Sequence, residues 1–156
     1  MRALGDLEFK VEEVYPIESE GSRARVVVQG DAAVSIDYSI PSASYGVGTR
    51  QILIETEYAI RITPAPSSSI SQEDVIAYLR YRVLVALSAS RELTPEDADS
   101  GALDEATMEA NYAAHPYHRQ GISSMVAALG LPPYPLPVTF DAIRASLEEE
   151  TRVAAK

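Results

Sequence analysis

The stretch "RQILIETEYAIRIT", Arg50–Thr63, carries the pattern that decides the fold class. Its even-numbered positions hold most of its large apolar side chains, namely Ile52, Ile54, Tyr58, Ile60 and Ile62. Polar side chains occupy positions between them: Gln51, Glu55, Glu57 and Arg61. A period of two residues is typical of a strand with one face on a core and the other in water. We therefore interpret Glu55 and Glu57 as the solvated side of a sheet and not as a catalytic pair.

The same alternation predicts further strands on both sides of this stretch. In "AYLRYRVLVAL" the apolar residues fall on odd numbers: Leu79, Tyr81, Val83, Val85 and Leu87. Even-numbered apolar positions predict a strand over Val26–Ile40, and "LEFKVEEVY" supplies a weaker first strand. The connections "PSASYGVGTR" and "TPAPSSSISQED" are rich in Gly, Pro and Ser and contain no pattern of helical length. We therefore expect four strands at about 7–89, in a meandering antiparallel sheet with one apolar face to be covered.

Helices are predicted after the strands, at about 94–130. Thr94 and Pro95 have the character of an N-cap and a first-turn proline. Two apolar stripes follow, separated by Pro116, which is expected to interrupt or restart the helix. The stripes are Leu103, Ala106, Ala110 and Ala113, then Ile122, Met125, Val126 and Leu129. The four prolines of "LPPYPLPV" predict an extended segment over 131–138, before a C-terminal helix at 139–152.

Composition limits the class of protein. A chain of 156 residues with 46% apolar content fits one domain with a single core. Its 13 basic and 23 acidic residues give a net charge of −10, which disfavours nucleic acid and anionic membrane surfaces as partners. The absence of cysteine excludes disulfides and thiolate metal sites. Because no signal-peptide pattern and no membrane-length apolar run is present, we expect a cytoplasmic protein without membrane insertion.

The candidate chemical groups do not assemble into an active site. His115 and His118 are three residues apart, but no cysteine or suitably placed third ligand accompanies them, so we interpret them as a helix-start residue and a surface imidazole. Ser123 and Ser124 lack the Gly-x-Ser-x-Gly elbow, and "YGVGTR" fits a hairpin connection better than a phosphate loop. The sequence therefore predicts no enzyme, no catalytic residues, no cofactor and no metal.

The stretch "HPYHRQGISSMVAALGLPPYPLPVTFDAI", His115–Ile143, resembles the C-terminal signature of the bacterial export chaperone SecB. The shared residues are Pro116, Tyr117, Arg119, Ile122, Ser123, Ser124, Met125, Val126, Pro133, Leu136, Pro137, Phe140, Asp141 and Ala142. The resemblance implies an α+β, SecB-like fold, a four-stranded antiparallel sheet with helices packed on one face. It also implies assembly as a homotetramer, a dimer of dimers.

The activity implied by the resemblance is that of a chaperone without chemistry, a holdase for unfolded polypeptides in protein export. The client-binding groove implied by the resemblance would be walled by Ile122, Met125, Val126, Leu129, Leu131, Tyr134, Leu136 and Phe140. The spacing of Leu103, Ala106, Ala110 and Ala113, together with the family habit, predicts that this stripe forms the oligomer interface. Replacing Ala110 with Glu is then expected to break the oligomer into smaller species.

Departures from the family pattern leave two alternatives open. Family members that deliver clients to the export motor carry acidic side chains on the exposed sheet face, where this chain has Tyr81 and Arg82. The connection "PIESEGSRAR" is shorter than usual, and Gln120 replaces a common Glu. These differences disfavour binding to the export motor and make a dedicated chaperone of a toxin–antitoxin system, with an antitoxin as its partner, the first alternative. The second is a non-chaperone oligomeric adaptor, whose mark would be groove positions filled by the protein's own side chains.

Overall fold

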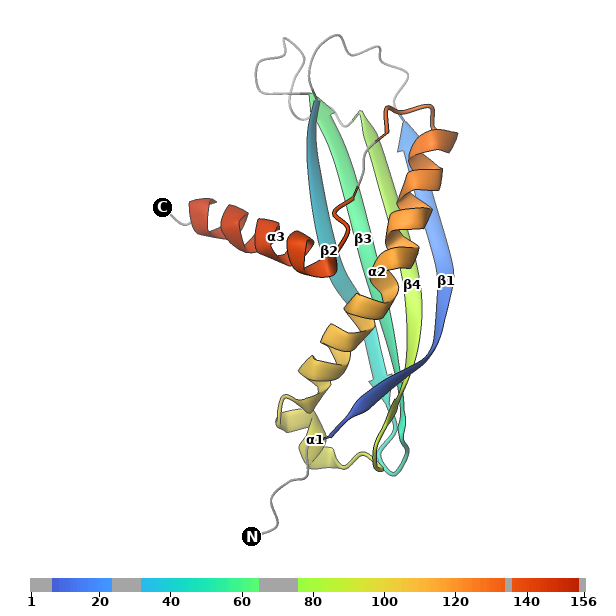
Figure 1. Ribbon diagram of the computed structural model, residues 1–156, viewed down its shortest axis with the longest axis vertical. Helices are drawn as coiled ribbons and strands as arrows, with labels where there is room; N and C mark the ends of the chain where they lie inside the picture. The colour runs from blue at the N-terminus through green and yellow to red at the C-terminus, as the bar shows by residue number, and fades with distance from the viewer. Residues whose placement is uncertain (1–6, 24–31, 65–75, 134–135, 155–156) are drawn as a thin grey trace.

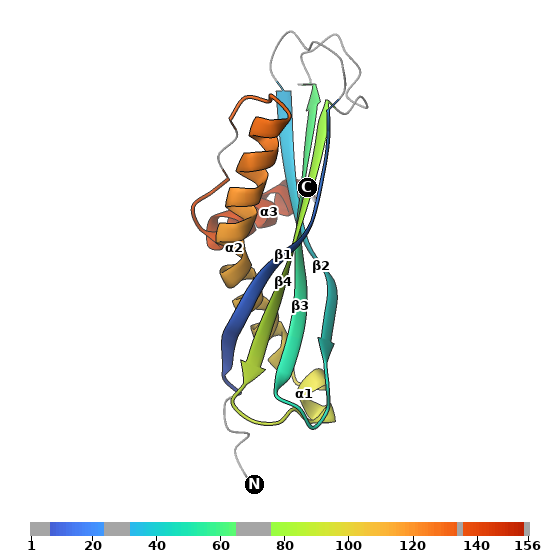
Figure 2. The ribbon, with the colours of Figure 1, turned by 90° about the vertical axis from the view of Figure 1, so that its right-hand side faces the viewer.

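A two-layer α+β structure is formed by one sheet and the helices on one of its faces (Figures 1 and 2). The computed structural model describes residues 7–23, 32–64, 76–133 and 136–154. The strands are β1 (Phe9–Arg23), β2 (Ala32–Tyr45), β3 (Gln51–Pro64) and β4 (Ala77–Ala89). The helices are α1 (Pro95–Asp99), α2 (Ala102–Ala128) and α3 (Phe140–Ala154). The predicted fold class, a four-stranded antiparallel sheet with helices on one face, is confirmed.

The strand order is β1-β4-β3-β2, and every neighbouring pair is antiparallel. Strands β2, β3 and β4 follow one another as a meander, as expected. The first strand departs from that expectation, because β1 pairs with β4 and not with β2. Alternation in a sequence assigns the two faces of a strand but does not identify the neighbouring strands. The pairing of β1 with β4 could therefore not be predicted from it.

Two of the predicted connections belong to strands. Most of "PIESEGSRAR" forms the second half of β1, which stays paired with β4 as far as Arg23 opposite Ala77. Pro16 is tolerated there because β1 is an edge strand, and the register shifts beside it, between Pro16 and Glu18. Likewise "PSASY" extends β2 to Tyr45. Residues 26–31 of the strand predicted over 26–40, and residues 65–74 of the connection predicted over 63–74, lie outside the described residues.

The core lies between the sheet and α2. Alternate residues of β3 and β4 point to this side, and most of them are buried: Ile52, Ile54, Thr56, Tyr58, Ile60, Leu79, Val83, Val85 and Leu87. Helix α2 packs mainly on β4 and also contacts β1 and β3. Its small residues allow this close packing, since Ala106 and Ala110 are fully buried in the core and Leu103 and Ala113 pack half-buried against it. The stripe expected at an oligomer interface is therefore largely consumed by packing within the chain.

Helix α2 runs without a break through Pro116, which corrects the expectation of an interruption. A proline inside a helix removes one backbone hydrogen bond and costs about 3 kcal/mol. Pro116 itself is exposed, whereas Ala114 before it and His118 and Ile122 after it are buried on the same sheet face. Burial on both sides of the proline offsets its cost and keeps the two halves of the helix in line.

The end of α2 is tied to β1. Arg23 donates hydrogen bonds from Nη1 to the carbonyl oxygens of Leu129 and Gly130, both at 2.9 Å. Gly130 adopts a positive φ of 64°, the conformation that commonly closes a helix. A guanidinium at this position also complements the negative end of the helix dipole.

Helix α3 projects sideways past β2, with the C-terminal end far from the sheet (Figure 1). Its first turn anchors it, because Phe140 and Ile143 are buried in the core that contains Tyr58 and Leu79. The observed helix, Phe140–Ala154, lies close to the predicted range of 139–152.

Candidate functional site

Half of the predicted groove residues are core residues. Ile122 and Phe140 are 0% and 1% exposed, and Val126 and Leu136 are 3% and 5% exposed. They share one apolar cluster, packed against β3 and β4, so in this conformation they do not wall an open groove. The physical reason is that an apolar i, i+3, i+4 stripe on a helix beside a sheet is removed from water by packing against that sheet.

The remaining predicted groove residues lie nearer the surface. Met125, Leu129 and Leu131 are half-buried at the edge of the same cluster. Met125 and Leu129 lean over Gly21 of β1, with side-chain carbons 3.2 and 3.3 Å from the position that a Cβ atom would take there. Tyr134 lies outside the described residues.

A row of apolar side chains on β2 is more accessible than most inner-face side chains of β3 and β4. This row, called the β2 row below, consists of Val34, Ile36, Tyr38 and Ile40, all half-buried and all flanked by exposed residues. It stays accessible because α2 packs over β4, β1 and β3, and because β2 is an edge strand. Sequence reasoning identified the apolar alternation of β2 but not its special position, which depends on the strand order.

Both histidines belong to a buried polar cluster, which corrects their interpretation as a helix-start residue and a surface imidazole. His115 Nδ1 lies 2.7 Å from the hydroxyl oxygen of Tyr58, and its Nε2 lies 2.8 Å from the carbonyl oxygen of Pro137. A carbonyl oxygen only accepts, so Nε2 carries the hydrogen of the neutral ring and Tyr58 donates to Nδ1. One imidazole thus joins β3, α2 and the segment that leads into α3.

The second histidine of this cluster stacks on the Tyr58 ring, with the ring centroids 3.9 Å apart. His118 Nε2 lies 2.8 Å from Thr56 Oγ1, and the Thr56 hydroxyl lies 3.4 Å from the carbonyl oxygen of Val83. If Nε2 donates to Thr56 and Thr56 donates to Val83, both contacts are satisfied and only an acceptor, Nδ1, is left unpaired. Burial lowers the pKa of His118 to about 3 and also lowers the pKa of His115.

This cluster has the character of a structural network. Among the described residues, no group of three or more His, Cys, Asp or Glu side chains is placed to hold a metal ion. Burial raises the pKa of Tyr58 above the ordinary value, so its hydroxyl stays protonated at neutral pH and is not available as a phenolate base or nucleophile. Neutral imidazoles paired with hydroxyl and carbonyl groups instead fix the position of α2 on the sheet.

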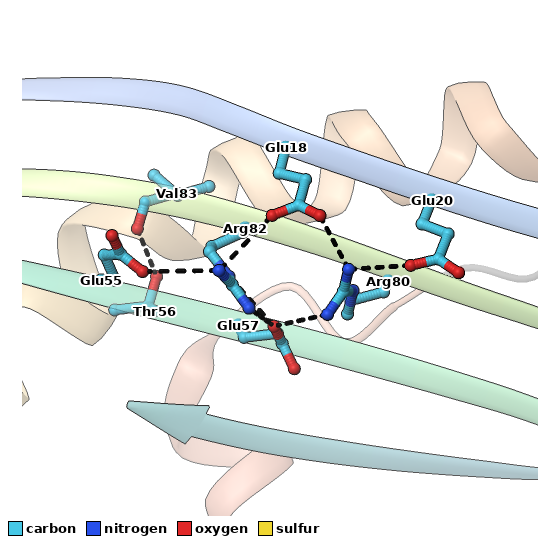
Figure 3. A network of polar contacts seen from close by, with 8 residues as sticks. All are labelled: Glu18, Glu20, Glu55, Thr56, Glu57, Arg80, Arg82 and Val83. Carbon is cyan, nitrogen blue, oxygen red and sulfur yellow. Dashed lines mark hydrogen bonds and ion pairs between the residues drawn. The ribbon is translucent and has the colours of Figure 1, made fainter. Parts of the chain in front are cut away.

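The opposite face of the sheet carries a network of ion pairs between β1, β4 and β3 (Figure 3). Arg80 contacts Glu18 and Glu20 at 2.7 and 2.8 Å, and Arg82 contacts Glu57 at 2.7 Å. Arg82 also lies within 4 Å of Glu18 and Glu55. Tyr81 is not part of this face, because its ring packs beneath α2 against Gly121 and His118. The two arginines thus offset part of the negative charge of the four glutamates and weaken the negative field of this face.

A shallow depression of about 440 Å³ lies on this same open face, toward the ends of β1, β3 and β4. Leu53 and Ala86 contribute apolar surface to it, and Glu12, Glu13 and Gln51 supply polar groups. Tyr15 and Leu53 are each more than two-fifths exposed. The hollow is separate from the predicted groove, which lies on the helical side.

No protein-family model and no curated protein matches the chain. Comparison with solved structures finds a similar fold in a SecB-like chaperone from Mycobacterium tuberculosis, solved in complex with a ChAD peptide from the HigA1 antitoxin. The match has a TM-score of 0.64 and 13% sequence identity, and it covers 83% of this chain and 89% of that chain. The chain therefore has a SecB-like fold. Among its described helices, none is long and apolar enough to cross a membrane.

Proposed function

We propose that the chain is a SecB-like holdase, which binds unfolded or non-native polypeptides through apolar surface. The observation that carries the proposal is the β2 row, four half-buried apolar side chains on an edge strand of a SecB-like fold. Contiguous apolar surface that remains accessible on an acidic protein commonly marks a site that binds a partner. Met125, Leu129 and Leu131 remain candidates for the same surface, and Tyr134 is retained from the sequence resemblance alone.

An extended polypeptide is the ligand that matches an edge strand. Its backbone pairs with the free edge while every second side chain lies beside the apolar row, on the same face of the sheet. Each apolar side chain that leaves water contributes about 25 cal/mol per Å², against the cost of ordering the peptide. Pro41 and the register shift between Ser39 and Ser42 restrict regular pairing to the part of β2 before them.

A dedicated chaperone for an antitoxin is the second candidate. It is favoured by the partly neutralised open face, where Arg80 and Arg82 pair with acidic side chains of the kind implied to contact the export motor. The structural neighbour bound to an antitoxin peptide gives independent support. A cytoplasmic location and assembly into a homotetramer complete the proposal, and general protein export is its less favoured form.

The adaptor alternative is also supported by one observation, the burial of Ile122, Val126, Leu136 and Phe140 by the chain's own packing. An adaptor that lost its groove would bind no unfolded chain at all. The adaptor and the holdase therefore differ in a single measurable property.

The test is suppression of aggregation of a chemically unfolded model protein by the purified oligomer. Ile36→Asn in the β2 row should abolish most of the suppression, whereas Asp37→Asn, on the exposed side of the same strand, should leave it intact. Both variants should keep the wild-type circular dichroism spectrum. Absence of suppression by the wild-type protein at several-fold excess would reject the holdase and favour the adaptor.

A further inference from the structure

Five residues that span the end of the proline-rich segment and the first residue of α3 form a strap across the inner face of the sheet. The strap, residues 136–140, is buried at both ends and exposed at Val138 between them. Leu136 and Phe140 are almost fully buried, while Val138 between them is 74% exposed. Two apolar side chains four residues apart are thus seated in the protein while the connecting backbone crosses its surface.

The seat of the strap adjoins the β2 row. The ring of Phe140 packs edge-on against Tyr38 of that row, with centroids 5.2 Å apart, and against Tyr112 of α2 at 5.6 Å. Val34 and Ile36 pack on the same apolar cluster as Leu136 and Phe140. The β2 row is therefore the uncovered remainder of a larger apolar surface, part of which the strap already occupies.

A hydrogen bond at Pro137 ties the middle of the strap to α2, and a second hydrogen bond, from Tyr112 of α2 to Asp141, holds the residue just after the strap. His115 Nε2 donates to the carbonyl oxygen of Pro137, and Tyr58 holds the ring in the required tautomer by donating to Nδ1. The other polar groups of the strap are not buried with it, since Val138 and Thr139 are exposed. The strap thus combines two apolar anchors with one hydrogen-bonded latch.

We propose that the strap is a built-in competitor for the polypeptide-binding surface, latched by His115 and displaced when a client binds. This inference rests on the proposed holdase function. It also defines the chemistry of the client, because the strap and the client segment would occupy the same apolar surface and should therefore have similar side chains. The preferred client segment is uncharged and carries an aliphatic and an aromatic side chain four residues apart, as in Leu-Pro-Val-Thr-Phe, residues 136–140.

The first test measures the sign of a change in affinity. Reduced and carboxymethylated α-lactalbumin, a permanently unfolded protein, serves as the probe, and binding is followed by fluorescence anisotropy. Leu136→Ala should weaken the seat of the strap and tighten probe binding about tenfold. Val138→Ala, on the exposed middle of the strap, should bind the probe as the wild type does. An unchanged or weaker affinity of Leu136→Ala would overturn the inference, because a residue in the client-binding wall predicts weakening.

The second test uses the latch and includes a rescue. His115→Phe should tighten probe binding about threefold or more, because it removes the hydrogen bond to Pro137. His115→Gln should return the affinity toward the wild-type value, since its amide can donate to Pro137 and accept from Tyr58. Equal affinities of both variants and the wild type would contradict the role of the latch.

A third measurement needs only the wild-type protein and so does not depend on the folding of any variant. Hydrogen exchange of the peptide covering 136–143 should accelerate when the probe is added, while exchange along β2 should slow. Binding without acceleration in 136–143 would overturn the strap inference and leave the holdase in place. Failure of the wild type and of every variant to bind the probe would reject the proposed function, and the inference with it.

Discussion

Gly121 shows how one residue fixes the distance between α2 and the sheet. A methyl group built on Gly121 would overlap the ring of Tyr81, and that ring also packs edge-on against His118. Alanine normally stabilises a helix by about 1 kcal/mol relative to glycine. Here we expect the overlap to exceed that gain, because the ring lies between the helix and its own strand and has little room to move.

Gly121→Ala should therefore destabilise the protein by about 1–3 kcal/mol, the usual cost of overpacking a core. The measurement is urea unfolding followed by circular dichroism. Gln120→Ala, at the exposed neighbouring position, is the matched control and should unfold near the wild-type midpoint. A Gly121→Ala variant that is as stable as the wild type would show that α2 can move away from Tyr81.

The buried histidines predict a loss of stability in mild acid. Burial lowers the pKa of His118 to about 3 and lowers that of His115, with Arg119 adding to the latter, whereas an unfolded histidine keeps its ordinary pKa of 6.5. Below pH 6.5 the unfolded chain therefore binds more protons than the folded chain does. Stability is complete above the unfolded pKa and falls as the pH drops below 6.5 toward the folded pKa.

Urea unfolding at pH 7, 6 and 5 should show this loss, at up to about 1.4 kcal/mol per pH unit for each histidine. The ion pair of Asp97 with Arg91 affects the stability only at lower pH. Arg91 lowers the pKa of the Asp97 carboxyl group, so the stabilisation by this pair is lost only as the pH falls below the ordinary pKa of 3.8. A His118→Gln variant should show a shallower dependence between pH 7 and 5. Equal stability of the wild type at these three pH values would mean that the histidines are not buried in solution.

The sequence revealed little of this residue-scale detail. His115 and His118 looked like surface residues because their partners, Thr56 and Tyr58, are distant in the chain and approach only when α2 lies on β3. The alternation of β3 pointed to Tyr58 as a core residue, but a polar contact depends on two elements at once.

At the scale of elements, the last turn of α2 depends on a side chain from β1. Arg23→Ala should remove both hydrogen bonds to the carbonyl oxygens of Leu129 and Gly130 and destabilise the protein by about 1 kcal/mol. Amide exchange should accelerate in the last two turns of α2 and leave its first turns unchanged. Arg61→Ala, which removes an exposed arginine from β3, provides the control. Uniform acceleration along the whole helix would contradict a local capping role.

The elements that the sequence predicted best are those with a strong period of their own. Strands β3 and β4 alternate cleanly and lie where expected, whereas β1 and β2 extend into stretches whose Gly, Pro and Ser content favours turns. Long-range pairing with β4 and β3 overrides that local preference. For the same reason, packing on the sheet carries α2 through Pro116.

At the scale of the whole molecule, the burial of Ala110 changes the result expected from Ala110→Glu. Ala110 is fully buried between α2 and the sheet, so Ala110→Glu should place an unpaired carboxylate in the core. The cost, on the order of several kcal/mol, is comparable with the total stability of a small domain. The variant should therefore lose its native circular dichroism spectrum instead of dissociating into folded subunits.

Tyr117→Glu is the matched variant for association, because Tyr117 is 40% exposed on the outer side of the same helix. It should keep the native spectrum, and light scattering then reports whether this side of α2 joins subunits. If the Ala110→Glu protein is folded and has a reduced mass, the result would support the oligomer interface that the alanine spacing predicted.

The fold as a whole was predictable because a signature of the C-terminal third and a count of alternating strands pointed to the same architecture, which the match at a TM-score of 0.64 confirms. The candidate site was less predictable. Leu136 and Phe140 have the same apolar character whether they face a client or their own core, and only the packing against Tyr38 and Tyr58 distinguishes these cases.

The pairing of β1 with β4 has a consequence for how the chain is made. During synthesis on the ribosome, the segment around Phe9 emerges long before its partner around Ala89. Until then, the β1 segment lacks the neighbour it has in the finished sheet, while β2 and β3 can already form a hairpin. Closure of the sheet waits for contacts distant in sequence, which are slow to form and leave strand edges open meanwhile. A protein proposed to bind unfolded polypeptides would thus pass through an unpaired, exposed state during its own synthesis.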